Sequence, residues 1–167
     1  MQPNLCFHNV RRKVEREGGR PRYGWMFLPR RIEELPGEEY LIAVHHAIWN
    51  APDGTTVDVT PFHDDPKHHP VTVDGSVLFL LDGDANPRII RDALATLPCK
   101  FFAIGDDAGL AVHVRDLRRE EYRKCREIYA AAEAAPPGAI VDSDGAIISP
   151  RYPGIAKTPM TLPANSD

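Results

Sequence analysis

The sequence predicts an α+β domain in which an N-terminal helix packs on a mainly antiparallel sheet. Residues 39–50 are β-branched and apolar on both faces, which is typical of an interior strand. Shorter apolar segments follow, separated by turns rich in Gly, Pro and Asp. Two further segments, residues 4–17 and 116–135, combine helical apolar spacing with capping residues.

Length and composition indicate one domain and limit its partners. The 167 residues are 43% hydrophobic and 26% charged, with a net charge of −4, and we expect a single domain over residues 1–135. Residues 136–167 are Pro-rich and predict an extended or disordered tail. The negative charge argues against a nucleic-acid partner. No apolar run is long enough for a membrane span and no secretory signal is visible, so we expect a cytoplasmic protein.

The first helix is predicted over residues 4–17. Asn4 can act as its N-cap, and Gly18 with Gly19 ends it. This assignment places Cys6 in the first helical turn.

Two strands and a hairpin are expected next. Residues 20–28 carry aromatic side chains at alternate positions, and Gly24 among them allows another segment to approach the backbone. After a loop over residues 29–37, the interior strand at 39–50 leads through a turn into a strand at 55–60, forming a β-hairpin.

The second half is predicted from shorter patterns. We expect loops, short strands and two helices. They are a loop at 62–70, a strand at 75–81, a helix at 86–97 beginning near Pro87, strands at 101–104 and 110–114, and a helix at 116–135 capped by Asp116. Within the tail, residues 139–141 and 146–148 predict a small hairpin.

One cysteine is placed to act as a nucleophile. The three cysteines include no C-x-x-C pair, so neither a disulfide framework nor a thiolate zinc site is indicated. A helix N-terminus and a nearby imidazolium together lower the pKa of a thiol, and Cys6 has the first of these by position. If hairpin positions whose numbers add to 104 face each other, His46 lies beside Asp58, which can orient its ring. A register shift of one residue selects His45 instead.

The order of these motifs resembles the transglutaminase-like core of the papain-like superfamily. A helix-borne Cys6 is followed by Tyr23-Gly24-Trp25, by His46-Ala47-Ile48-Trp49 and by Val57-Asp58-Val59-Thr60-Pro61. The resemblance implies that Cys6 is the nucleophile, His46 the base and Asp58 the orienting acid. It covers about a third of the chain. Residues 6–10 and 45–49 also resemble segments of small bacterial proteins, which indicates no reaction.

The resemblance implies a cysteine-dependent acyl-transfer enzyme, namely an amide hydrolase such as a thiol protease, a deamidase or a transglutaminase-like enzyme. Its substrate would be a peptide or an amide-containing small molecule, and no cofactor is required. Gln2, Asn4 and the backbone N–H of Cys6 are candidates for stabilising an oxyanion. His45, Trp25 and Trp49 are candidates for binding substrate, although both tryptophans also fit a hydrophobic core.

Two alternatives remain open at the sequence level. The same fold can serve as a binding module without turnover. Five of the seven histidines lie between His45 and His69, so a metal enzyme is also conceivable. An iron site would use His63, Asp65 and His113, and a zinc site would use His63, His68 and His69.

Overall fold

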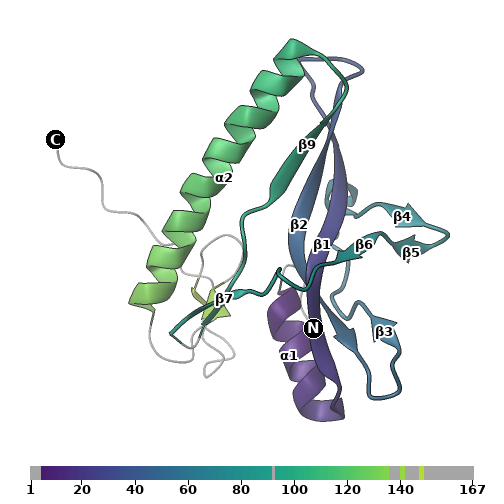
Figure 1. The fold of residues 1–167 in the computed structure, drawn as a ribbon, viewed down its shortest axis with the longest axis vertical. Helices are drawn as coiled ribbons and strands as arrows, with labels where there is room; N and C mark the ends of the chain where they lie inside the picture. Colours follow the sequence, from purple (N-terminus) through teal and green to yellow (C-terminus); the bar gives the residue numbers. More distant parts are fainter. Residues whose placement is uncertain (1–4, 92, 136–139, 142–146, 149–167) are drawn as a thin grey trace.

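The computed structural model describes residues 5–91, 93–135, 140–141 and 147–148. Its elements form an antiparallel sheet with a helix toward each end (Figure 1). The predicted α+β class and antiparallel pairing are confirmed, since every strand pair of the described residues is antiparallel. Predictions for Gln2, for Asn4 and for most of the tail lie outside the described residues.

A long hairpin forms the centre of the sheet. Strands β1 (Arg20–Arg31) and β2 (Glu39–Asn50) pair along their entire length, from Arg20 with Asn50 to Arg31 with Glu39. The bounds predicted for β2 are confirmed. β1 continues beyond the predicted end at Leu28 because its ladder with β2 extends to the turn.

The outer edge of β2 carries two separate strands. β9 (Lys100–Ile104) pairs with residues 39–43 of β2, and β3 (Thr56–Val57) pairs with residues 49–50. No described strand pairs with residues 44–48 on that edge. The interval between β9 and β3 is where the candidate site lies.

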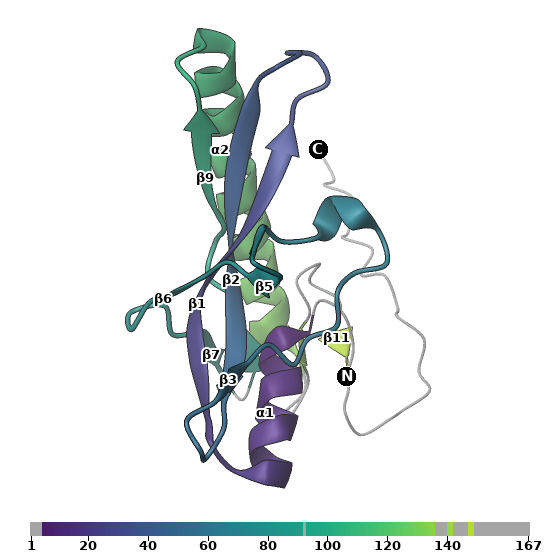
Figure 2. The ribbon, with the colours of Figure 1, turned by 90° about the vertical axis from the view of Figure 1, so that its right-hand side faces the viewer.

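Helix α1 (Cys6–Glu17) packs against β2 near the β3 end of the sheet, as Figures 1 and 2 both show. Leu5 occupies its N-cap and makes no side-chain capping bond. The helix ends where Gly18 adopts φ 74°, which glycine tolerates without strain. The predicted stop is therefore confirmed. The core under α1 is a cluster of four buried residues: Cys6, Val10, Ala47 and Trp49.

Helix α2 (Ala108–Ala134) replaces two predicted elements. The strand predicted at 110–114 is wrong, and the helix predicted from Asp116 begins eight residues earlier, where Asp107 Oδ1 accepts the Leu110 N–H at 2.8 Å. Leu110 and Val114 lie one turn apart and are both buried against β9. A segment of only five mostly apolar residues fits the spacing of a strand as well as that of a helix, and packing against β9 favours the helix here.

The helix predicted at 86–97 is also wrong. This segment forms a hairpin of β7 (Arg88–Ile90) and β8 (Ala93–Ala95). Arg91 has φ 53°, a left-handed conformation that interrupts a right-handed helix. Ile89 is 75% exposed, so the apolar stripe that indicated a helix is not buried as one face. Tertiary contacts, including the bond from Leu97 N to His45 Nδ1, favour the hairpin.

The remaining strands are short. The strand predicted at 75–81 is divided into β5 (Ser76–Val77), which pairs with β4 (Thr72–Val73), and β6 (Phe79–Leu81), which pairs with β1. The predicted loop at 62–70 contains a short 3₁₀ helix, Pro66–His68. β10 (Ile140–Val141) and β11 (Ile147–Ile148) form the small hairpin expected there. Neither described helix has the length and apolar character needed to cross a bilayer.

Candidate functional site

His46 and Asp58 form a hydrogen-bonded pair beside the open edge of β2. His46 Nε2 lies 2.8 Å from Asp58 Oδ2, and the residue His46 is only 4% exposed. The hairpin register differs from the predicted one, since Trp49 pairs with Val57 and Asn50 with Thr56. These numbers add to 106 rather than 104, a difference that preserves side-chain alternation, so Asp58 stays on the His46 face.

The Asp58 carboxylate is oriented by its own backbone. After β3 ends at Val57, Asp58 Oδ1 accepts the Thr60 N–H at 2.9 Å, an Asx turn. The other oxygen, Oδ2, is thereby directed to the imidazole. The turn explains why β3 is shorter than the predicted strand at 55–60: the chain leaves the sheet to present this carboxylate.

The Cys6 thiol reaches the same imidazole from the start of α1. Cys6 is the first residue of the helix and is 8% exposed. Its side chain hydrogen-bonds the His46 ring. Because Nε2 faces Asp58, Nδ1 is the nitrogen that remains for the thiol. The backbone N–H groups of the first helical turn, which the N-cap residue Leu5 does not cap with its side chain, belong to the same turn as Cys6.

The surroundings of His46 favour its protonated form. Burial by itself lowers the pKa of the ring, but the negative charge of Cys6 and the hydrogen bonds to Asp58 and Cys6 outweigh it. The net effect raises the pKa of His46 to about 10. At neutral pH the His46 ring is therefore an imidazolium.

His45 has a different environment, although it is adjacent and equally buried. Its Nε2 donates to the Ala85 carbonyl at 2.7 Å, and its Nδ1 accepts the Leu97 N–H at 2.9 Å. Burial lowers the pKa of this ring, which is therefore neutral. Both nitrogens are used to join β2 to the segments on either side of the β7–β8 hairpin, so none is left for a substrate or an oxyanion.

The two tryptophans lie in the core with their indole N–H groups bonded. Trp25 Nε1 donates to Asp82 Oδ2 at 2.8 Å, and Trp49 Nε1 donates to the Gly18 carbonyl at 2.9 Å. Both side chains are buried, and Trp49 packs beside Cys6. Trp49 therefore packs against the site, whereas Trp25 lies in a separate cluster with Ala43 and Ala85, and the burial of both rings leaves no open face for a ligand.

Gly24 fulfils the expectation that another segment approaches its backbone. It pairs with His46 across the β1–β2 ladder. A Cβ there would overlap the Leu80 carbonyl oxygen and lie 2.7 Å from Phe79 Cζ. The missing side chain therefore lets β6 cross closely, and it brings the Phe79 ring within 6.3 Å of the His46 ring, centroid to centroid.

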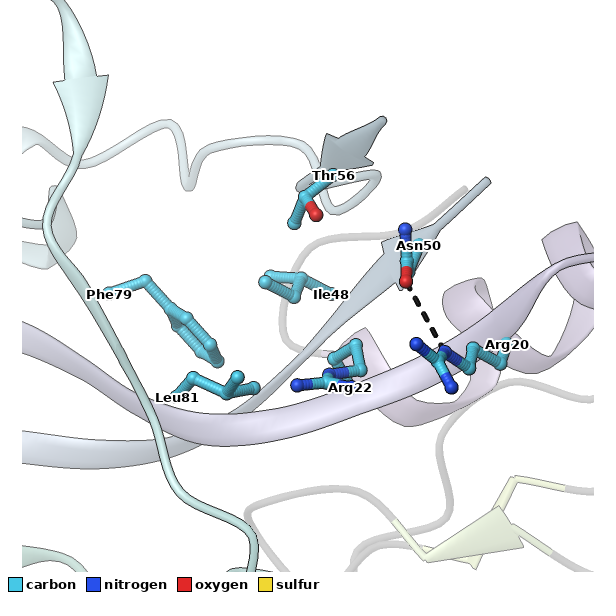
Figure 3. A pocket seen from close by; sticks show the side chains of 7 residues that line it. All are labelled: Arg20, Arg22, Ile48, Asn50, Thr56, Phe79 and Leu81. Atoms are coloured by element: carbon cyan, nitrogen blue, oxygen red, sulfur yellow. Dashed lines mark hydrogen bonds between the residues drawn. The ribbon is translucent and has the colours of Figure 1, made fainter. Parts of the chain in front are cut away.

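Beyond Phe79 lies an open pocket of about 370 Å³ that the sequence patterns did not predict. Its lining residues belong to β1, β2, β3 and β6, and Figure 3 draws all of them: Arg20, Arg22, Ile48, Asn50, Thr56, Phe79 and Leu81. The alternation Arg20-x-Arg22 along a strand was the one signal available, because it places two guanidinium groups on the same face.

The metal alternatives find no support in the geometry. Among the described residues, no three His, Cys, Asp or Glu side chains are grouped so as to hold a metal ion. His63 Nδ1 accepts the Asp65 N–H at 3.0 Å, and the His63 and His68 rings contact each other at a tilt of 59°. His113 lies instead on α2, against Tyr40.

The other two cysteines lie together away from this site. Cys99 N–H and Cys125 Sγ both approach Glu121 Oε1, at 2.8 and 3.7 Å. Burial, followed by the Glu121 charge, raises the pKa of both thiols, that of Cys125 to about 12. They are poor nucleophiles at neutral pH and serve as internal controls for Cys6.

No protein-family model, curated protein or solved structure matches the chain. The transglutaminase-like resemblance therefore stays a prediction from the sequence.

Proposed function

We propose that this protein is a cysteine-dependent acyl-transfer enzyme acting on an amide, with a papain-like arrangement of Cys6, His46 and Asp58. The observation that carries the proposal is that the His46 ring is hydrogen-bonded to two partners, the Cys6 thiol and the Asp58 carboxylate. The bond to Asp58 joins His46 Nε2 to Oδ2 at 2.8 Å. A nucleophile, a base in contact with it and a third group orienting the base are the elements of thiol catalysis.

In the proposed reaction the Cys6 thiolate attacks the amide carbonyl carbon. The C–N bond then breaks as His46 gives its proton to the departing nitrogen, leaving a thioester on Cys6. Water or an amine next attacks the thioester while His46 takes up its proton. The S–C bond breaks, and the thiolate and imidazolium are restored. Asp58 keeps the ring oriented throughout.

The oxyanion formed in each attack requires hydrogen-bond donors. The first turn of α1, in which Leu5 makes no side-chain capping bond, contains Cys6 and can supply backbone N–H groups, including that of Cys6 itself. Hydrolysis and transfer share these steps and differ only in the acceptor.

Alkylation with iodoacetamide tests the proposal within one molecule. Each thiol is followed by mass spectrometry between pH 5 and 9. We expect Cys6 to react at least about 100-fold faster than Cys99 and Cys125 near pH 6, because only a thiolate reacts and the other two are held protonated. His46→Gln should remove the advantage, whereas His113→Gln, a matched change on α2, should leave it unchanged.

Equal and slow labelling of all three thiols would contradict the proposal of a thiol enzyme and favour the non-catalytic binding module. Selective labelling of Cys6 that survives His46→Gln would show an accessible thiol but no catalytic pair.

A further inference from the structure

The pocket beyond Phe79 continues the His46 face of the sheet. Along the β1–β2 ladder, three successive cross-strand pairs lie on one face: Gly24 with His46, Arg22 with Ile48, and Arg20 with Asn50. The last two pairs form the floor of the pocket. The Phe79 ring stands over Gly24 and contacts both His46 and the pocket.

The pocket combines positive charge with an apolar wall. Two of its seven lining residues are arginines, and none is acidic. Ile48, Phe79 and Leu81 supply the apolar surface. An anion at one end of a short aliphatic chain complements such a lining, because its charge meets a guanidinium and its methylenes meet hydrocarbon.

Arg22 is the arginine that remains available to bind. Arg20 Nε donates to Asn50 Oδ1 at 3.3 Å, which holds that side chain at the far end of the pocket. Among the described residues no carboxylate pairs with Arg22, and Figure 3 shows its side chain reaching across the floor toward Leu81. Its planar guanidinium can bind a carboxylate through two parallel hydrogen bonds.

The strand spacing sets the distance between Arg22 and His46 along this face. Ile48, the cross-strand partner of Arg22, is two residues from His46 on the same strand, about 7 Å at the rise of a β-strand. That length corresponds to a chain of a few methylenes between an amide and a carboxylate.

We propose that this pocket is the specificity site of the enzyme and that it selects amide substrates carrying a carboxylate, which Arg22 binds. This inference rests on the proposed function of Cys6 and His46.

The test uses thiol alkylators that differ only in charge. N-iodoacetyl derivatives of glycine, β-alanine and γ-aminobutyrate each place a carboxylate at a different distance from the reacting carbon, and their carboxamides are the neutral counterparts. The rate of Cys6 alkylation by each acid is divided by the rate for its amide. We expect a ratio of at least about 5 for one chain length at low ionic strength, falling at high salt because the pocket is open to solvent.

Arg22→Gln should reduce this ratio to about 1. Arg30→Gln removes the same charge from the same face of β1, far from the pocket, and should keep the wild-type ratio. Circular dichroism and thermal unfolding verify that both variants fold.

The outcomes separate this inference from the proposed function. If iodoacetamide fails to select Cys6 in the wild type, the proposed function falls and the specificity site with it. If Cys6 is selected but the acid-to-amide ratio is near 1, or is unchanged by Arg22→Gln, the enzyme stands and the carboxylate site is overturned. If a phosphonate reagent reacts faster than its neutral counterpart while none of the carboxylate reagents does, the assignment of the site to a carboxylate is also overturned.

Discussion

Replacing Asp58 by asparagine should lower the pKa of His46 while leaving the fold intact. The substitution preserves the shape of the side chain and removes its charge. The bond it weakens joins His46 Nε2 to Asp58 Oδ2 at 2.8 Å, between side chains that are 6% and 19% exposed. A hydrogen bond between charged groups at a site so protected from solvent contributes about 1.5–3 kcal/mol. Since about 1.4 kcal/mol corresponds to one pH unit, we expect the pKa of His46 to fall from about 10 to about 8–9.

NMR of ¹³Cε1-labelled histidine between pH 5 and 11 measures this pKa directly, with the His46 signal assigned from its absence in His46→Gln. Asp53→Asn is the matched control, because Asp53 makes the same kind of Asx bond, to Thr55 N at 2.8 Å, in the exposed turn of the hairpin. It should leave the His46 midpoint unchanged. The reasoning is refuted if wild-type His46 titrates near 6.5, or if its midpoint is the same in Asp58→Asn.

Two further predictions concern stability. The pKa of folded His46 is raised above its unfolded value of 6.5, so its contribution to stability is full below pH 6.5 and is lost as pH rises through about 10. The melting temperature of the wild type should therefore fall more steeply between pH 7 and 9 than that of His46→Gln, as followed by circular dichroism; equal slopes would contradict the assignment. Gly24→Ala should lower the free energy of unfolding in urea by about 1–3 kcal/mol, because its Cβ overlaps the Leu80 carbonyl. Gly83→Ala, where nothing lies within 4 Å of the added Cβ, should leave the free energy of unfolding nearly unchanged. If Gly24→Ala also leaves it nearly unchanged, β6 can move away from the added Cβ at little cost.

The parts of the fold that the sequence predicts correctly are those with strong local patterns. β2 is a twelve-residue segment with apolar residues on both faces, and the α1 stop at Gly18 is a backbone property of glycine. The errors fall where a short pattern fits two structures. Residues 110–114 satisfy a strand or a helix turn, and residues 86–97 carry a helical stripe that a left-handed Arg91 divides. In both places packing with distant segments decides the structure, and no single-sequence pattern contains that information.

The candidate site shows the same division. His46 and Asp58 are twelve residues apart across one hairpin, so their proximity follows from local geometry and tolerates the register difference. Arg22 and Phe79 meet only because β6 crosses β1, 57 residues further along the chain. Nothing in the local sequence of β6 indicates which strand it will pair with, so the pocket could not be predicted.

The interval between β9 and β3 explains why the site forms on β2. A continuous strand along this edge would occupy the space that the start of α1 and the Asx turn at Asp58 now share. By pairing only with residues 39–43 and 49–50, the two flanking strands fix both ends of β2, and no strand of the described part of the chain pairs with this edge at His46. On its other side, Gly24 admits Phe79 against the same ring. His46 is thus held in a rigid strand while its side chain is approached from α1, from the turn after β3 and from β6. If His46 is the proposed base, this convergence supplies the fixed geometry that acid–base chemistry requires.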